Sequence, residues 1–408
     1  MKTPSVLIVG DAAASTGFAR VLHSIIRRLK DKYDVHHLGI NYFGDPHDAD
    51  WKIYVARLGG DVYGVSRLQP LIEKIKPQLV FFINDVWILS NYMPVLEKYR
   101  GLVKTVMYFP VDGAPLDPDV VKPICAVDQL VAYNQYGKQV LEQTIDLIRR
   151  DEPEFATPRI TVIPHGVDTN LFYPYADETG PEGVVTGRFR AKKKLLPNTE
   201  DFLNSFIVLN ANRNQPRKRI EITMKGFAIF AQNKPDNVKL YLHMGLEDVG
   251  WNLSTLAKRY DMEGRLIISN LSKDVPADSV ERLNLIYNAC EVGINTSTGE
   301  GWGLISFEHA ATGAAQIVPR HTSCEELWQG AAEMLEPVFT LTTERVLTEA
   351  QYVSPEGVAR ALERLYENPG HLRAVSEAAY RNATRTDYNW DRIAEQWDDL
   401  FQQLLHQE

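Results

Sequence analysis

Cysteine is scarce in this chain of 408 residues, and the chain also lacks a basic excess and any long apolar run. Its three cysteines, Cys125, Cys290 and Cys324, lie far apart and form no CxxC pair. This spacing argues against a disulfide framework and favours a reducing cytoplasm. No stretch approaches the roughly 20 apolar residues of a membrane-spanning helix. Because 44 basic and 53 acidic residues give a net charge of −9, a general polyanion-binding surface has no support.

Several motifs that carry chemistry are also absent. The sequence contains no GxSxG nucleophile elbow and no GxxxxGK[ST] phosphate loop, which sets aside a serine hydrolase and a P-loop nucleotidase. The histidines have no HExxH or paired-cysteine context. Two Asp-x-Asp segments, 48–50 and 117–119, follow no buried strand with further ligands nearby and are interpreted as surface loops. We therefore expect no metal site.

What is present is an ordinary globular composition with a repeated strand and helix pattern. Apolar residues make up 44% and charged residues 24% of the chain, and about 150 residues per domain predicts two or three domains. Short apolar runs alternate with helical patterns, as in a parallel sheet covered by helices on both faces. In the first half the predicted strands are 6–9, 79–83, 105–109, 130–133 and 160–163.

A second series of the same kind follows, so we predict two doubly wound α/β domains. Its strands are 207–210, 238–242, 266–268, 292–294 and 316–318. Apolar periodicity fades in between, where 176–204 is interpreted as a linker with a basic cluster at 188–194. The predicted domains are 1–175 and 205–389. The last segment, 390–408, is predicted to be a helix whose single apolar face must pack on another part of the fold.

The strongest local signal is the segment 299–308, which follows a predicted strand and opens a helix. Its glycines let the backbone approach a ligand, and the free N–H groups at a helix start attract phosphate or sugar oxygens. Glu300 and Glu308 bracket this turn, so both carboxylates can accept hydrogen bonds from the hydroxyls of one ligand. A tight turn without a ligand would carry the same glycines.

Four cations form a second cluster at the end of the first strand of the second half. In open α/β sheets, ligands bind at this carboxyl edge. An anion such as a diphosphate suits the cluster, because arginine binds phosphate with a bidentate fork and lysine as a point charge. A solvated basic loop is the alternative. The four residues are Arg213, Arg217, Lys218 and Arg219.

Two loops of the first half are further candidates. Ser15, Thr16 and Gly17 form a small-residue loop between a strand and a helix, which can admit a ligand or simply permit tight packing. Asp112 follows the strand that ends at Phe109, at an edge where a carboxylate can face a ligand. An ordinary Asp-Gly turn is the alternative for Asp112.

Taken in order, these segments resemble the retaining glycosyltransferases of family four, which have the GT-B fold and use nucleotide sugars. The segment 163–168 reads IPHGVD, where the family has IPNGVD. Arg213 and Lys218 match the R-x4-K pair of the family, and Glu300 and Glu308 match its E-x7-E pair. The helix at 390–408 resembles the one that crosses back onto the first domain. The matches span nearly the whole chain.

The resemblance implies two Rossmann-like domains that face each other across a cleft, with the acceptor on the first and the nucleotide sugar on the second. It implies transfer of a hexose to an acceptor hydroxyl with retention of the anomeric configuration. The donor is a nucleoside-diphosphate sugar, with UDP as the expected nucleotide, and neither a permanent cofactor nor a metal is needed. The implied catalytic residues are Arg213, Lys218, Glu300 and Asp112, and the implied donor-binding residues are Glu308, Gly301, Trp302, Gly303, Leu304, Ser15, Thr16 and Gly17.

Departures from the family pattern point to a divergent subgroup. The loop with Ser15 lacks the usual paired glycines, His165 replaces an asparagine, and Ala315 replaces a proline. Some segments resemble bacteriophage transferases that glycosylate hydroxymethylated pyrimidines in DNA, so the acceptor stays open among a saccharide, a small molecule, a lipid and a modified DNA base. A nucleotide-sugar epimerase and a non-catalytic sugar-nucleotide-binding protein are the alternatives. A cytoplasmic location is expected, and the oligomeric state stays open.

Overall fold

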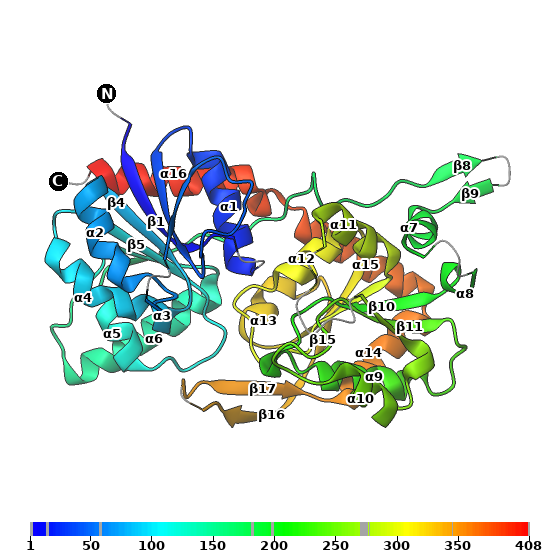
Figure 1. Cartoon of the computed structure of the whole chain (residues 1–408). Coiled ribbons are helices and arrows are strands. Elements are labelled where there is room, and N and C mark those ends of the chain that lie inside the picture. The colour runs from blue at the N-terminus through cyan, green and yellow to red at the C-terminus, as the bar shows by residue number, and fades with distance from the viewer. Residues whose placement is uncertain are drawn as a thin grey trace. The chain divides into compact units, whose positions relative to one another are not determined.

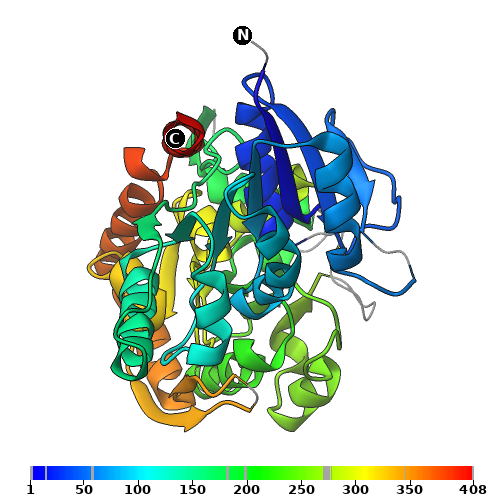
Figure 2. The ribbon, with the colours of Figure 1, turned by 90° about the vertical axis from the view of Figure 1, so that its left-hand side faces the viewer.

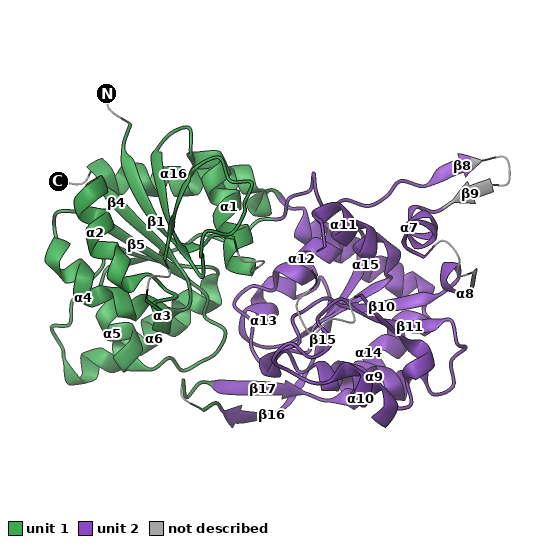
Figure 3. Cartoon of the chain, viewed as in Figure 1, with its two compact units in different colours: residues 1–166, 343–348, 386–408 green, residues 167–342, 349–385 purple. Residues whose placement is uncertain are grey.

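The computed structural model describes residues 3–13, 16–56, 59–180, 183–196, 200–269, 276, 278–344 and 346–406. The chain forms two compact units (Figure 3). Unit 1 comprises residues 1–166, 343–348 and 386–408, and unit 2 comprises 167–342 and 349–385. Both units are α/β and each contains a parallel sheet, which confirms the fold class predicted from the sequence.

Unit 1 is built on a seven-stranded parallel sheet in the order β3-β2-β1-β4-β5-β6-β7. Its central strands are apolar and buried on both faces, as expected for a sheet covered by helices on both sides (Figures 1 and 2). The five predicted strands agree with β1, β4, β5, β6 and β7 to within two residues at each end, whereas β2 and β3 were not predicted. The strands are β1 (Ser5–Asp11), β2 (Asp34–Ile40), β3 (Lys52–Val55), β4 (Leu79–Ile83), β5 (Lys104–Phe109), β6 (Gln129–Ala132) and β7 (Arg159–Val162).

The helices of unit 1 pack apolar stripes on this sheet. In α1 the buried positions recur at helical spacing, and Thr16 caps the helix by accepting a hydrogen bond from the Ala19 backbone at 3.1 Å. The helices are α1 (Gly17–Leu29), α2 (Val65–Ile75), α3 (Val86–Leu89), α4 (Met93–Leu96), α5 (Pro118–Ile124), α6 (Gln135–Asp151) and α16 (Trp390–His406).

The C-terminal helix α16 belongs to unit 1 although the chain leaves that unit at residue 166. Its apolar face packs on the sheet, with the Trp397 ring 4.7 Å from Phe81 and 4.8 Å from Tyr108. Arg28 of α1 donates a hydrogen bond to Asp391 of α16 at 2.5 Å. The apolar face predicted for the C-terminal helix therefore packs on unit 1.

Unit 2 repeats the architecture with a six-stranded parallel sheet in the order β12-β11-β10-β13-β14-β15. The chain order reverses beside β10, which is the arrangement that places ligands at the carboxyl ends of the neighbouring strands. The strands are β10 (Phe206–Asn210), β11 (Val238–Leu242), β12 (Leu266–Ile268), β13 (Val292–Ile294), β14 (Ala315–Pro319) and β15 (Glu333–Leu335).

Helices and two antiparallel hairpins complete unit 2. The hairpins are β8 (Glu178–Gly180) with β9 (Gly183–Val185), and β16 (Pro337–Thr342) with β17 (Glu349–Val353). The helices are α7 (Gly187–Leu195), α8 (Glu200–Leu203), α9 (Ile220–Ala231), α10 (Leu253–Arg259), α11 (Val280–Ala289), α12 (Leu304–Ala310), α13 (Thr322–Trp328), α14 (Pro355–Glu367) and α15 (Pro369–Ala383).

The segment 176–204, interpreted as a linker from the sequence, contains β8, β9, α7 and α8 and is part of unit 2. Polar contacts attach it to the unit. Arg188 donates a hydrogen bond to the Asn288 carbonyl at 3.3 Å, and Lys192 pairs with Glu291 at 2.6 Å. Arg190 pairs with Glu178 at 2.6 Å. Three cations of the basic cluster therefore have structural partners.

Candidate active site

The candidate site lies in unit 2, where two adjacent strands end. β10 and β13 pair in parallel, with Val208 opposite Val292 and Leu209 opposite Gly293. The loops that follow them, 210–219 and 295–303, are joined by the backbone, since the Thr298 N–H donates to the Arg217 carbonyl at 2.8 Å. The two strongest sequence signals, the basic cluster and the glycine-rich segment, therefore meet at one edge of the sheet.

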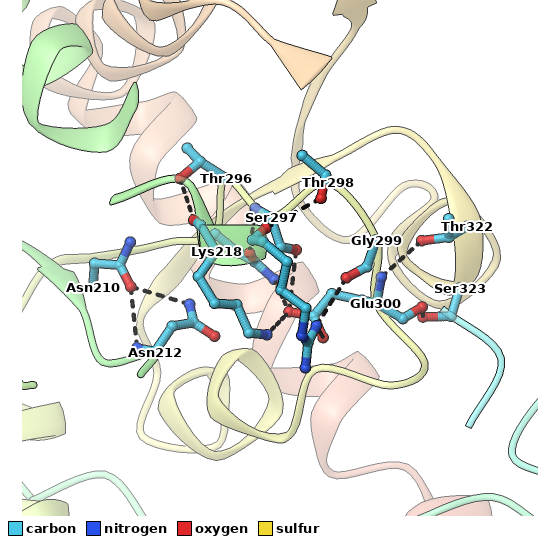
Figure 4. A network of polar contacts seen from close by, with 12 residues as sticks. Asn210, Asn212, Lys218, Thr296, Ser297, Thr298, Gly299, Glu300, Thr322 and Ser323 are labelled. Atoms are coloured by element: carbon cyan, nitrogen blue, oxygen red, sulfur yellow. Dashed lines mark hydrogen bonds and ion pairs between the residues drawn. The ribbon is translucent and has the colours of Figure 1, made fainter. Parts of the chain in front are cut away.

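A buried ion pair between Lys218 and Glu300 is the centre of this edge (Figure 4). Lys218 is 7% exposed and Glu300 is 4% exposed, so both charges are withdrawn from water. The carboxylate oxygen that pairs with Lys218 also accepts hydrogen bonds from Asn295 at 3.0 Å and Ser297 at 3.1 Å. Sequence reasoning brought Lys218 and Glu300 into one site but missed Asn295 and Ser297, which directly precede the glycine-rich turn.

The charges of this pair are set by opposing effects. Burial raises the pKa of Glu300, but the cations Lys218 and Arg217 outweigh it and bring the pKa down to about 2. Burial and then Arg217 lower the pKa of Lys218, and Glu300 opposes that shift. The Arg217 guanidinium lies 3.8 Å from the second Glu300 oxygen. The site therefore holds an ionised carboxylate between two cations.

The backbone of Glu300 is fixed by the start of α13. The Glu300 N–H donates to the Thr322 hydroxyl at 3.1 Å, and the Ser323 hydroxyl donates to the Glu300 carbonyl at 2.6 Å. Thr322 has φ 49°, in the left-handed region that β-branched residues rarely adopt. Such strain persists where the surrounding structure holds it, and it concentrates at functional sites.

The glycine-rich turn continues from Glu300 into α12. Gly303 has φ 87°, which a residue with a side chain would adopt only under strain, and a Cβ there would meet no atom within 4 Å. Trp302 is 3% exposed and stacks on Phe307 at 5.1 Å, so its ring is part of the core. Gly301 is buried, whereas Leu304 is partly exposed at the first position of α12.

Arg213 and Glu308 have other partners than the central pair. Arg213 forms a two-point ion pair with Asp248, with Nε to Oδ2 at 3.1 Å and Nη2 to Oδ1 at 3.0 Å. Glu308 is 3% exposed on α12 and accepts a hydrogen bond from the Tyr287 hydroxyl at 3.1 Å. The structure thus joins Lys218 with Glu300 directly and gives Arg213 and Glu308 their own buried or half-buried partners.

Arg219 is the cation of the predicted cluster that takes a different role. Its guanidinium lies between two aromatic rings, 5.2 Å from the centre of Trp251 and 5.1 Å from that of Tyr352. It also pairs with Glu221 of α9. These contacts anchor the start of α9, so Arg219 serves the structure of the loop.

The remaining sequence candidates lie in unit 1. Thr16 caps α1 and donates a hydrogen bond from its hydroxyl to Asp11 at 2.7 Å, and Gly17 is the first residue of α1. Ser15 lies outside the described residues. Asp112 is exposed after β5, and it adds to the effect of burial that raises the pKa of Tyr136 to about 12.

Two wider features of the described residues bear on the chemistry. Among the residues that the structure describes, no three His, Cys, Asp or Glu side chains come together as a metal centre would require. None of the described helices is both long enough and apolar enough to cross a bilayer.

Comparisons with known proteins agree with this architecture. Residues 253–399 match the family model described as glycosyl transferase-like. Sucrose-phosphate synthase from Thermosynechococcus elongatus has a similar structure, with a TM-score of 0.74 and 17% identity over 99% of both chains. HepE from Anabaena, in complex with UDP and glucose, gives a TM-score of 0.71 and 16% identity over 98% of this chain and 100% of that chain.

A UDP-forming trehalose-phosphate synthase from Burkholderia xenovorans gives a TM-score of 0.66 and 13% identity over 98% of both chains. Among curated proteins, no sequence matches this chain significantly. The solved structures match along nearly the whole chain, so the chain has the two-domain GT-B fold that the sequence predicted.

Proposed function

We propose that this protein is a retaining glycosyltransferase that moves a hexose from a nucleoside-diphosphate sugar to an acceptor hydroxyl. The observation that carries the proposal is the buried Lys218–Glu300 pair, flanked by Arg217 at the carboxyl ends of β10 and β13. A buried ion pair is a poor source of stability, so its presence at the ligand-binding edge of the sheet favours a role in binding or catalysis.

In the proposed reaction, the bond between the anomeric carbon and the diphosphate breaks, and the leaving group gains negative charge. Lys218, Arg217 and Arg213 supply positive charge for that diphosphate from adjacent loops. Glu300 accepts hydrogen bonds from hydroxyls of the sugar, and Glu308 from those of the ribose. The backbone of residues 301–304 contacts the sugar and phosphates, where Gly303 leaves open space.

We further propose that unit 2 binds the donor and unit 1 binds the acceptor, with Asp112 at the acceptor side. Ser15, Thr16 and Gly17 are proposed to contribute to donor binding from unit 1. UDP is the proposed nucleotide. HepE has been solved with UDP-glucose, and the trehalose-phosphate synthase is described as UDP-forming, which supports this choice. The acceptor is a saccharide, a small molecule, a lipid or a modified DNA base.

A hydroxymethylated pyrimidine in DNA is the weaker of these acceptors on structural grounds. The basic cluster at 188–194 would supply the local DNA contact, but Arg188, Arg190 and Lys192 each bind partners within unit 2. Lys193 and Lys194 are the exposed cations of that cluster. Two lysines give only a small electrostatic attraction for a DNA backbone.

A donor screen tests the proposal. Purified protein is incubated with UDP-, GDP- and ADP-sugars, with and without a panel of saccharide, lipid and hydroxymethylated-DNA acceptors, and mass spectrometry detects released nucleoside diphosphate and product. We expect release that increases with one acceptor, and a loss of turnover of about 10²-fold or more in Lys218→Ala, Arg213→Ala and Glu308→Gln.

The same screen separates the alternatives. Conversion of a nucleotide sugar into its epimer without an acceptor would favour an epimerase, and tight nucleotide binding without any turnover would favour a non-catalytic binding protein. Near-normal turnover in folded Lys218→Ala protein would contradict the leaving-group argument. The anomeric configuration of the product, determined by NMR, tests retention.

A further inference from the structure

The two-point ion pair between Arg213 and Asp248 determines which edge of the guanidinium can contact a ligand. Asp248 occupies the Nε and Nη2 edge of the guanidinium at 3.1 and 3.0 Å, while the Arg213 side chain is 43% exposed. A guanidinium carries five N–H donors, and two are used on this edge. Three donors remain, and two of them, one on Nη1 and one on Nη2, form an edge that can make a bidentate contact with a phosphate.

We propose that Asp248 is a positioning residue, which holds Arg213 in the orientation that binds the diphosphate of the donor. This inference rests on the proposed function, because it assigns a role toward the same ligand. Asp248 itself does not contact the ligand in this proposal. Its side chain is only 10% exposed, so it lies beneath the more exposed arginine that it orients.

The loop that carries Asp248 is fixed on the loop that carries Arg213. Asn214 is fully buried, accepts a hydrogen bond from the Trp251 N–H at 3.0 Å and donates one to the Trp251 carbonyl at 2.7 Å. A Cβ at Gly250 would lie 2.1 Å from the Asn214 side-chain oxygen, so this position requires glycine for the close approach. Asn214 thereby sets the distance between the two loops directly beside Arg213.

A second contact fixes the same loop from the other side. The Trp251 ring lies 5.2 Å from the Arg219 guanidinium, which also contacts Tyr352 at 5.1 Å. The loop 245–251 is therefore held at Trp251 by hydrogen bonds and by a cation–π contact. A rigid support of this kind is what a positioning residue needs, because it keeps the arginine in one orientation before the ligand arrives.

The backbone of Asp248 allows a clean substitution. Its φ is 39°, in the left-handed region that asparagine and aspartate tolerate better than other residues with side chains. Asp248→Asn therefore keeps the backbone conformation and the side-chain shape. It replaces one acceptor oxygen by an NH₂ group, which cannot accept a hydrogen bond from Arg213.

Two explanations of the role of Asp248 predict opposite changes in ligand affinity for the Asp248→Asn variant. A carboxylate that only lies near the diphosphate repels it, so Asp248→Asn would tighten binding. A carboxylate that positions Arg213 improves binding, so its loss leaves the arginine with more rotamers to lose when the ligand binds. In the second case we expect the Kd to rise about tenfold.

Isothermal titration calorimetry with UDP and with inorganic pyrophosphate measures the effect in the full chain. The variants are Asp248→Asn, Arg213→Ala and the double variant, with Asp236→Asn as the matched control. Asp236 is an exposed carboxylate that pairs with Arg265 at 3.3 Å and lies two residues before β11, at the opposite edge of the sheet. The expected result is weaker binding in each single variant, no further loss in the double variant and no change in the control.

The double-mutant cycle distinguishes a positioning role from a structural one. If Asp248→Asn weakens binding equally with and without Arg213, or tightens it, the inference is wrong while the proposed function stands. If the wild-type protein binds neither UDP nor pyrophosphate, the proposed function fails and the inference fails with it. Unchanged urea unfolding of Asp248→Asn, measured in parallel, supports the assignment of the effect to Arg213.

Discussion

Replacement of Lys218 by methionine is expected to destabilise unit 2 in a way that depends on pH. Methionine keeps an unbranched apolar stem but removes the ammonium group that pairs with Glu300. The carboxylate would keep its hydrogen bonds from Asn295 and Ser297, at 3.0 and 3.1 Å, and the Arg217 guanidinium at 3.8 Å. A mostly buried carboxylate would thus lose its nearest cation.

The size of the destabilisation caused by Lys218→Met follows from the burial of the ion pair. Loss of one partner of a buried ion pair destabilises a protein by about 3–5 kcal/mol. We expect about 3 kcal/mol at pH 8, the lower end, because Arg217 and the two hydrogen bonds remain. The pKa of Glu300, about 2 in the wild type, would rise because burial then has a weaker opponent. The deficit in the free energy of unfolding should therefore shrink as the pH falls toward 4.5, the ordinary pKa of a glutamate carboxyl group, where Glu300 begins to take up a proton.

The wild type should respond to acid in the opposite direction. The folded-state pKa of Glu300, about 2, lies below its ordinary value of 4.5, so the fold favours the ionised carboxylate, and stability is lost as the pH falls from 4.5 toward 2. The shift corresponds to about 3 kcal/mol. Glu300→Gln leaves Lys218 buried without its carboxylate, so its deficit should shrink as the pH rises and Lys218 loses its proton.

Hydrogen exchange followed by mass spectrometry, in urea between pH 4 and pH 9, measures these effects separately in each unit. Peptides of unit 1 serve as the internal control, since a two-unit chain need not unfold in one transition. The Lys218→Met, Glu300→Gln double variant should recover most of the stability, because the glutamine oxygen still accepts the hydrogen bonds from Asn295 and Ser297. A deficit below 1 kcal/mol, or one independent of pH in both single variants, would refute this reasoning.

Two further predictions concern unit 1. Burial lowers the pKa values of His37 and His165 to about 3. On acidification the unfolded chain therefore takes up protons before the folded chain does, and unit 1 should lose stability as the pH falls from 6.5 toward 3. A urea midpoint for unit 1 that does not fall between pH 7 and pH 5 would contradict this prediction. Trp397→Ala removes a fully buried ring that contacts Phe81 and Tyr108. We expect the free energy of unfolding of unit 1 to fall by about 3–5 kcal/mol. A comparable loss of stability in unit 2 peptides would contradict the placement of α16.

The sequence predicted ten of the strands of the two parallel sheets, but not β2, β3 and β15, and it predicted the meeting of two loops, because both depend on local patterns. Buried apolar runs predict parallel strands, and the carboxyl ends of adjacent strands share an edge. Lys218 and Glu300 each follow such a strand, so their proximity was predictable. Asp248 and Thr322 were not predictable, because they reach the site through loops after β11 and β14 whose sequences carry no ligand pattern.

The segment 176–204 shows a different limit of sequence reasoning. Hydrophobic periodicity detects helices that bury a wide stripe of large apolar side chains, whereas α7 buries only Gly187, Ala191, Leu195 and one lysine, Lys192. Arg188 binds the Asn288 carbonyl, and Lys192 is 4% exposed beside Glu291. A helix fixed in this way resembles a solvated basic linker in sequence, because a cation that is buried and paired cannot be told from one in water.

Several features that do little for stability meet at the carboxyl ends of β10 and β13. The Lys218–Glu300 pair withdraws two charges from water, and Thr322 and Asp248 adopt positive φ values of 49° and 39°. Buried charges and strained residues persist only where the surrounding structure holds them. The rest of the sheet of unit 2 is packed with apolar side chains such as Val208 and Ile317, both fully buried. A concentration of charge and strain at the edge where α/β sheets bind ligands is explained by ligand binding better than by folding.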